Sequence, residues 1–208
     1  MKIRLGFQKV LVMFFAGAVL ISGCGYSPPS SFYLLQSMPG IEKVKQTSIT
    51  GQGLAICVGP VMLPKYLDRP QIVTITRTSE VKLASFYRWA EPLQDNFIGV
   101  LAENLSQLLG TDRIIIFPRE SASSSDYQIM VTVIRFDGEP GGNAVLSARW
   151  SIYGKGGKQE LVSKKTDLSE PAGAEGYEAL VSAQSRAIAG LSKEIAGAIK
   201  AFGASEAR

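Results

Sequence analysis

The chain has 208 residues, of which 46% are hydrophobic and 19% are charged, so it is long enough for one domain with a full hydrophobic core. Three of its 22 basic residues, Lys2, Arg4 and Lys9, precede the first apolar run, and the rest nearly balance the 18 acidic residues, which gives no electrostatic signature of nucleic-acid binding. The absence of histidine excludes Ser-His-Asp and Cys-His catalysis and histidine-based zinc sites.

The N-terminus follows the pattern of an exported protein. The apolar run at residues 10–21 has about a dozen residues, too short for a membrane-spanning helix of roughly 20. Residues 21–24, with the sequence ISGC, resemble the lipobox of bacterial lipoproteins, which ends in the cysteine that is lipidated before cleavage. We therefore expect residues 1–23 to be a signal peptide and Cys24 to be the lipid attachment site. The alternative is an ordinary signal peptide, or an uncleaved anchor, that happens to contain a cysteine.

Lipidation of Cys24 would hold the mature protein on a membrane. Each methylene of a buried acyl chain adds about 0.8 kcal/mol to membrane binding, so several chains anchor a protein almost permanently. Residues 24–31 are rich in proline, serine and glycine and are interpreted as a lipidated tether, followed by a single domain at residues 32–208. Cys57 lies in an apolar run and is predicted to be a buried core residue, with no partner for an intrachain disulfide.

The first half of the domain is predicted to contain four strands and a helix. Short strands are expected at residues 32–35 and 54–62, and a hairpin of two strands at residues 71–76 and 81–86, with its turn near Thr78 and Ser79. Pro92 then opens a helix whose apolar residues recur at three- and four-residue spacings. Gly110 suits the left-handed residue that follows a helix end.

The second half is predicted to be a strand, a meander and a long helix. A buried strand at residues 113–117 precedes a polar loop, and three consecutive strands follow at about residues 127–136, 144–153 and 160–168. A last helix from about residue 174 to 202 has an apolar stripe that should lie on the sheet. The expected fold class is α+β: a largely antiparallel β-sheet with two long helices packed on one face.

Motifs that could carry chemistry have simpler structural explanations. The GKGGK sequence at residues 154–158 lacks the spacing of a phosphate-binding loop and lies between two strands, so we interpret it as a turn. Glu91 and Asp95 could pair for acid/base catalysis, but their place near the start of a helix is that of favourable charges on the helix dipole. The sequence therefore identifies no catalytic residue, cofactor site or metal ligand, and we expect a protein that is not an enzyme.

One loop is a candidate for partner contact. Two prolines bracket residues 63–70 and stiffen a segment that carries Tyr66, Leu67, Asp68 and Arg69, which suits a presented surface. The alternative is equally open: Tyr66 and Leu67 fold back onto the core, and Asp68 caps a turn. The aromatic residues at 86–93 are expected to pack at the corner between a strand and the first helix.

Five stretches in chain order carry a family resemblance. They are VGPVMLPKYLDRPQIV (58–73), RWAEPLQDNF (88–97), VTVIRFDG (131–138), LSARWSIYG (146–154) and LSKEIAGAI (191–199). Together with the lipobox they resemble the PqiC/YmbA-like lipoproteins, the ABC-type transport auxiliary lipoprotein family.

The resemblance implies a membrane location and partners. It implies a non-enzymatic lipoprotein on the periplasmic face of the outer membrane, acting as a docking or adaptor subunit for an MCE (mammalian cell entry) protein and an ABC permease and ATPase that move phospholipids between membranes. Gly25, after the lipidated cysteine, is similar to the residue in lipoproteins released to the outer membrane. A homo-oligomer is expected only by analogy, because MCE partners form rings. The rival hypothesis is a lipid-binding module that holds an acyl chain between the sheet and the helices.

Overall fold

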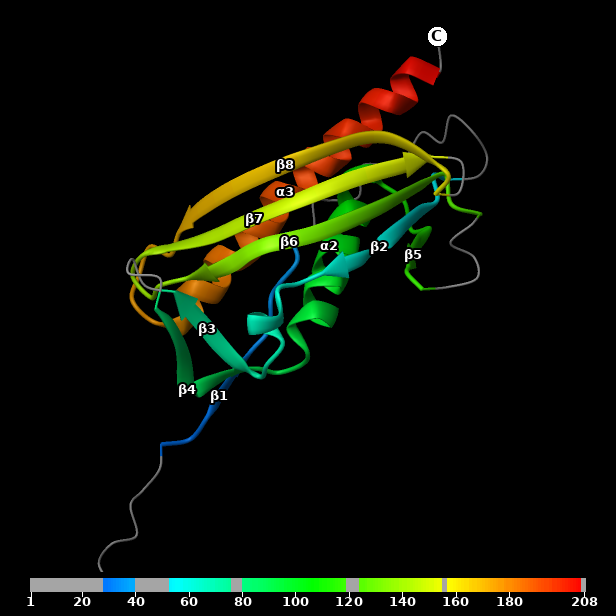
Figure 1. The fold of residues 1–208 in the computed structure, drawn as a ribbon. Helices are drawn as coiled ribbons and strands as arrows, with labels where there is room; N and C mark the ends of the chain where they lie inside the picture. Colours follow the sequence, from blue (N-terminus) through cyan, green and yellow to red (C-terminus); the bar gives the residue numbers. More distant parts are fainter. Residues whose placement is uncertain (1–27, 40–52, 76–79, 119–123, 155–156, 207–208) are drawn as a thin grey trace, which may run out of the picture.

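The computed structural model describes residues 28–39, 53–75, 80–118, 124–154 and 157–206. The expected signal peptide, Cys24 and the expected hairpin turn at Thr78 and Ser79 lie outside these described residues. The fold of these described residues is α+β, as predicted, with two sheets and two long helices (Figure 1).

The larger sheet has five strands in the order β5-β2-β6-β7-β8. They are β2 (Ile56–Met62), β5 (Ile114–Ile116), β6 (Tyr127–Gly138), β7 (Asn143–Gly154) and β8 (Gln159–Pro171). The last three pair antiparallel, which confirms the predicted meander. The strand β2 runs parallel to both β5 and β6, so this sheet is mixed.

The predicted hairpin forms a second, smaller sheet. β3 (Gln71–Ile75) and β4 (Val81–Trp89) pair antiparallel, and β1 (Ser31–Tyr33) adds to β4 in parallel, giving the order β1-β4-β3. Ile72, Val73 and Thr74 of β3 are all buried, so both faces of this strand are covered. The single expected sheet is therefore wrong, because β3 pairs only with β4 and the hairpin joins β1 and not the larger sheet.

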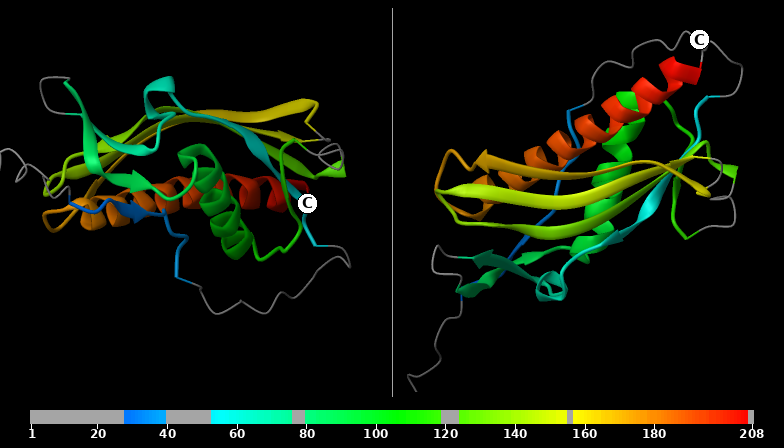
Figure 2. Two further views of the ribbon diagram at one scale, coloured as in Figure 1. Left: turned by 90° about the horizontal axis from the view of Figure 1, so that it is seen from below. Right: turned by 45° about the horizontal axis from the view of Figure 1, so that its top comes forward.

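Both helices cover the same face of the larger sheet (Figure 2). α2 (Leu93–Leu109) begins after Pro92 and ends at Gly110, whose left-handed φ of 64° and bond to the Ser106 carbonyl confirm the predicted boundary. α3 (Tyr177–Glu206) begins three residues later than expected, because Gly176 has a φ of 105°, which no α-helix contains.

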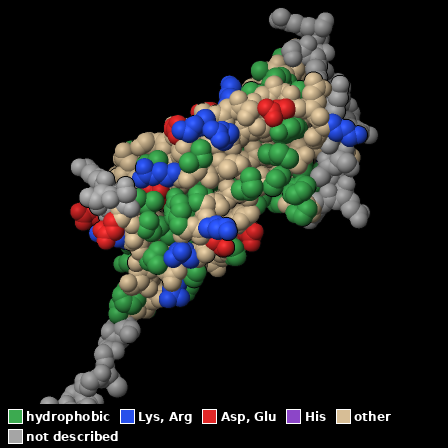
Figure 3. Space-filling model, viewed as in Figure 1, with side chains coloured by type: hydrophobic (Ala, Val, Ile, Leu, Met, Phe, Trp, Pro, Cys, Tyr) green, Lys and Arg blue, Asp and Glu red, His purple; other side chains and the backbone are tan. Residues whose placement is uncertain are grey.

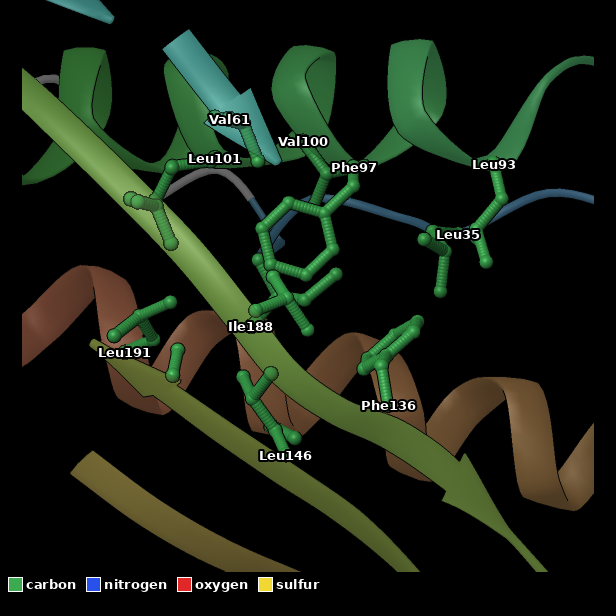
Figure 4. Packing of buried hydrophobic residues seen from close by; sticks show 14 of the residues in the cluster. Leu35, Val61, Leu93, Phe97, Val100, Leu101, Phe136, Leu146, Ile188 and Leu191 are labelled. Carbon is green, nitrogen blue, oxygen red and sulfur yellow. The ribbon is translucent and has the colours of Figure 1, made fainter. Parts of the chain in front are cut away.

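The core lies between the two helices and the sheet. Alternate residues of β7 face it and are fully buried, as the period-two pattern predicts: Ala144, Leu146, Ala148, Trp150 and Ile152. Figure 4 shows Phe97 of α2 beside Phe136 of β6, and the two rings meet edge to face with centroids 5.4 Å apart. The indole N–H of Trp150 donates to the hydroxyl of Thr166, at 2.9 Å, so the largest buried side chain leaves no polar atom unpaired.

The segment after β1 is bonded to both helices. The backbone N–H groups of Leu35 and Met38 donate to the side-chain carbonyls of Asn96 and Asn104 on α2, at 2.7 and 2.8 Å. The N–H of Gln36 donates to the Ser185 hydroxyl on α3, at 3.0 Å. Three anchors of this kind within four residues hold residues 35–38, which we call the strap, against the helices.

Gly138 and Gly99 provide a matched pair of stability tests. A Cβ at Gly138 would lie 2.5 Å from the Asn143 carbonyl oxygen and 2.9 Å from the Ala144 Cα, so Gly138→Ala should lower the free energy of unfolding by about 1–3 kcal/mol. A Cβ at Gly99 in α2 meets nothing within 4 Å, so Gly99→Ala should raise it by about 0.5–1 kcal/mol. Urea unfolding measures both, and equal effects would contradict the close approach at Gly138.

Asn104 provides a test of the strap. Its side chain is fully buried, accepts from the Met38 N–H and donates to the Ser192 hydroxyl at 3.3 Å. Asn104→Ala should lower the free energy of unfolding by about 1–3 kcal/mol, because it leaves buried polar groups without partners. Hydrogen exchange should accelerate at the Met38 amide. Lys193→Ala, at an exposed position beside Ser192, should change neither measurement, and unchanged Met38 exchange in Asn104→Ala would overturn the role of the strap.

Candidate docking surface

The loop predicted to contact a partner folds as a short 3-10 turn. This turn, η1 (Lys65–Leu67), follows Pro64 and is closed by backbone bonds from Leu67 to Pro64 and from Asp68 to Lys65. Leu67 is only 2% exposed and belongs to the main core, so it is not available for partner contact and the expectation for this residue is wrong. The physical reason is that a one-turn helix places its residues in different directions, and the apolar side chain takes the inward one.

The other three residues predicted to contact a partner differ in their solvent exposure. Asp68 is exposed, and Tyr66 and Arg69 are half-buried. Tyr66 packs its ring against the core, as the alternative interpretation of this loop anticipates, while the N–H of Asp68 closes the turn. The structure therefore leaves Tyr66, Asp68 and Arg69 as candidates on this loop.

An ion pair between an exposed guanidinium and a buried carboxylate lies beneath Tyr66. The Asp137 carboxylate is fully buried and accepts three bonds of 2.8–3.0 Å from the guanidinium of Arg135. The Tyr66 hydroxyl donates to the same carboxylate at 3.5 Å. Burial and the charge of Asp137 raise the pKa of Tyr66, so its hydroxyl stays protonated and remains a donor at neutral pH. The loop is thus fixed to β6.

Sequence reasoning did not single out Arg135 and Asp137. The signal was present, since residues two apart in a strand share a face and a cation and an acid at that spacing can pair. What the pattern could not show is that the loop at Tyr66 would cover this face and remove the carboxylate from water.

Two exposed apolar side chains lie beside the loop. Met62 at the end of β2 is 54% exposed and pairs in register with Thr132 of β6, and Ile134, two residues further along β6, is 44% exposed. Their neighbours Val131 and Val133 point into the core. Figure 3 shows this outer face of the molecule, where hydrophobic and basic side chains are interspersed. Met62, Tyr66, Asp68, Arg69 and Ile134 form what we call the docking surface.

The described residues offer no arrangement typical of catalysis or metal binding. Among them no cluster of three histidine, cysteine or acidic side chains could hold a metal ion. Glu91 and Asp95 are both exposed at the start of α2, where the helix dipole accounts for them. Cys57 is fully buried as predicted, and burial raises the pKa of its thiol, which makes the reactive thiolate scarce.

Buried apolar side chains line the space between the sheet and the helices, where the rival hypothesis places an acyl chain. Side chains from β6, β7, α2 and α3 meet directly between the sheet and the helices (Figure 4). Two hollows of about 670 and 520 Å³ lie instead at the surface, one on each side of the strap, and the larger is lined in part by Ser182, Ser185 and Arg186. Within the described residues, no helix is long and apolar enough to span a bilayer.

Known proteins resemble the chain in sequence. Residues 33–196 match the family model of the ABC-type transport auxiliary lipoprotein component. The intermembrane transport lipoprotein PqiC of Escherichia coli strain K12 is 24% identical over 164 residues, which cover 79% of this chain and 83% of that protein. The protein of the same name from Shigella flexneri gives the same values.

Solved structures resemble the chain in fold. A crystal structure of an uncharacterized protein has a TM-score of 0.67 at 24% identity and covers 83% of this chain and 99% of its own. Protein XCC0632 from Xanthomonas campestris has a TM-score of 0.67 at 14% identity, with coverage of 86% and 99%. At these identities the two structures show a shared fold alone. The family match, in contrast, spans the domain from β1 into α3, and the chain therefore belongs to the ABC-type transport auxiliary lipoprotein family.

Proposed function

We propose that this protein is a non-enzymatic lipoprotein of the outer membrane that docks an intermembrane transport assembly from the periplasmic side. Its partners are an MCE-domain protein and the ABC permease and ATPase that work with it, and the cargo is phospholipid. Because MCE proteins form rings, the proposal includes a symmetric homo-oligomer of this chain.

The observation that carries the proposal is the family match over residues 33–196, together with a PqiC relative whose name assigns it to intermembrane transport. The domain is also suited to a scaffold, because a large cluster of buried side chains forms its core and Tyr66 of the candidate contact loop bonds to the buried Asp137 carboxylate. A pre-ordered surface loses little conformational entropy on binding, which favours an adaptor.

The anchor at Cys24 completes the proposal. Lipid on this cysteine, followed by the tether of residues 24–31, keeps the domain at one membrane while the partner spans the periplasm. Gly25 after the cysteine favours the outer membrane as the site of residence.

The docking surface supplies the contacts in this proposal. Met62 and Ile134 provide exposed apolar area, and Asp68 and Arg69 provide charges of both signs at its edge. An apolar centre with a polar rim is the usual anatomy of a protein interface. Leu67, which is buried, contributes to the shape of the loop and not to contact.

The partners are tested by isolating the lipidated full-length protein from detergent-extracted envelopes and identifying the captured proteins by mass spectrometry. An MCE-domain protein should be recovered, with its permease and ATPase. Recovery of neither an MCE protein nor a permease would refute the function. A Cys24→Ala variant should lose its fractionation with membranes, and retention of that variant in the membrane fraction would refute the lipid anchor.

The contact residues are tested with matched charge substitutions. Met62→Asp combined with Ile134→Asp should reduce MCE capture at least about tenfold, since a buried unpaired charge costs more than 1.4 kcal/mol at an interface. Ile116→Asp is the control, because Ile116 is similarly exposed, at 41%, but belongs to the edge strand β5. Urea unfolding of both variants checks that folding is retained. Equal loss of capture in the control would show that the docking surface is placed wrongly.

A further inference from the structure

The small sheet has an inner and an outer face. β1 runs parallel to β4 with Tyr33 in register with Trp89, and Trp89 is 5% exposed and belongs to the core. The ring of Tyr87, on the same face, stacks on Tyr177 of α3 with centroids 4.2 Å apart and 18° between the planes. Because neighbouring residues of a strand point to opposite faces, Phe32 must point away from the core.

The small sheet and the residue that follows β1 carry exposed apolar side chains, and two of them, Phe32 and Leu34, also line the larger surface hollow beside α3. Phe32 is 62% exposed, Leu34 is 47% exposed and Phe86 is 38% exposed. We call these three residues the tether-side apolar face. Val81 and Leu83, further along β4, are also large and exposed. Isolated exposed apolar residues are ordinary on protein surfaces. Several such residues on one small sheet indicate a surface that contacts a membrane or another protein.

A guanidinium belongs to the same face. Arg88 is in register with Phe32, so the two side chains leave the sheet on the same side. Arg88 is half-buried, and among the described residues its Nε–H has no hydrogen-bond partner and its charge has no ion pair within 4.0 Å. Exposed aromatic and aliphatic side chains with a cation beside them are typical of protein segments at the boundary between lipid headgroups and acyl chains.

The position of this face in the chain indicates its occupant. Phe32 follows Cys24 by eight residues, and even a fully extended chain of that length spans only about 28 Å. The strap cannot detach to lengthen the tether while the domain stays folded, because the amides of Leu35, Gln36 and Met38 are bonded to the helices. Figure 1 shows the small sheet at one end of the molecule and the C-terminal end of α3 at the other. Of the two ends, the small sheet is the one that the tether holds near the bilayer.

We propose that the tether-side apolar face lies in the headgroup and upper acyl region of the membrane that holds the Cys24 lipid. This contact is a second attachment to the bilayer, and it fixes the orientation of the domain, which a flexible lipid tether alone cannot do. The inference rests on the lipid anchor of the proposed function but not on the MCE partner.

A fluorescent probe tests the contact in the full-length lipidated protein. Phe32→Cys gives a single accessible thiol, because Cys57 is fully buried and the thiol of Cys24 is acylated. An environment-sensitive dye is attached there, and the protein is reconstituted into vesicles of phosphatidylethanolamine and phosphatidylglycerol. In the vesicles, the attached dye should emit at a shorter wavelength than the free dye does in aqueous buffer. Lipids that carry a nitroxide near the top of the acyl chain should quench most of the emission of the attached dye.

The control is the same dye at Lys164→Cys, an exposed position in β8. Its emission should stay that of an aqueous dye, without quenching. Equal spectra and quenching at the two positions would overturn the proposal. An emission shift at position 32 that is seen only at high protein density, and that nitroxide lipids do not quench, would identify a second copy of the chain as the occupant of this face. That result would also overturn the proposal.

A double serine variant separates this inference from the docking function. Phe32→Ser combined with Phe86→Ser should leave urea unfolding within about 0.5 kcal/mol of the parent, because both positions are exposed. A dye at Leu34→Cys in that variant should lose its nitroxide quenching. Membrane quenching without MCE capture would refute docking alone, while MCE capture without quenching would refute the membrane contact alone.

Discussion

The burial of the inner face of β7 beneath α3 is the constraint on which the rest of the structure depends. The alternating apolar residues of β7 meet the apolar stripe of α3, and Trp150 is joined through the Thr166 hydroxyl to Glu194 of that helix. Once α3 is fixed along the meander, α2 can close the remaining apolar area only on the same side, where Asn104 reaches Ser192. All helical cover then lies on one face of the larger sheet. The small sheet packs on the helical side, where Tyr87 of β4 stacks on Tyr177 of α3. The other face of the larger sheet carries η1, whose Tyr66 donates to Asp137 of β6.

Sequence reasoning recovered most of the local structure because local structure follows from periodicity. The period of two in β7, Pro92 before α2 and Gly110 after it each have a direct physical meaning, and each predicts its element correctly. The division into two sheets was not predicted. It depends on β1 pairing with β4, strands separated by about fifty residues, and no local pattern records which distant strands will meet.

The candidate site was only partly predictable for a related reason. The two prolines around Tyr66 pointed to the right loop, but the direction of Leu67 depends on the core beneath it. Asn104 and Asp137 look like surface residues in the sequence, because a polar residue in an amphipathic element is usually exposed. Both are fully buried and paired, and they determine how the strap and the loop are held. Buried polar residues thus carry much of the specific geometry of this domain, and they are the residues that hydrophobic patterning hides.

The strap also has a mechanical consequence. A pull on the chain that precedes β1, such as the proposed lipid anchor would exert, runs along β1. It reaches the amides of Leu35, Gln36 and Met38, whose acceptors belong to two different helices. The force is shared between α2 and α3. The side chain of Leu35 is buried in the core and resists displacement of the strap together with these hydrogen bonds. Under the proposed function, the lipidated end and a large attached assembly would put this domain under tension whenever the two membranes move apart. In this fold that tension is spread over the core of the domain and is not concentrated on its first strand.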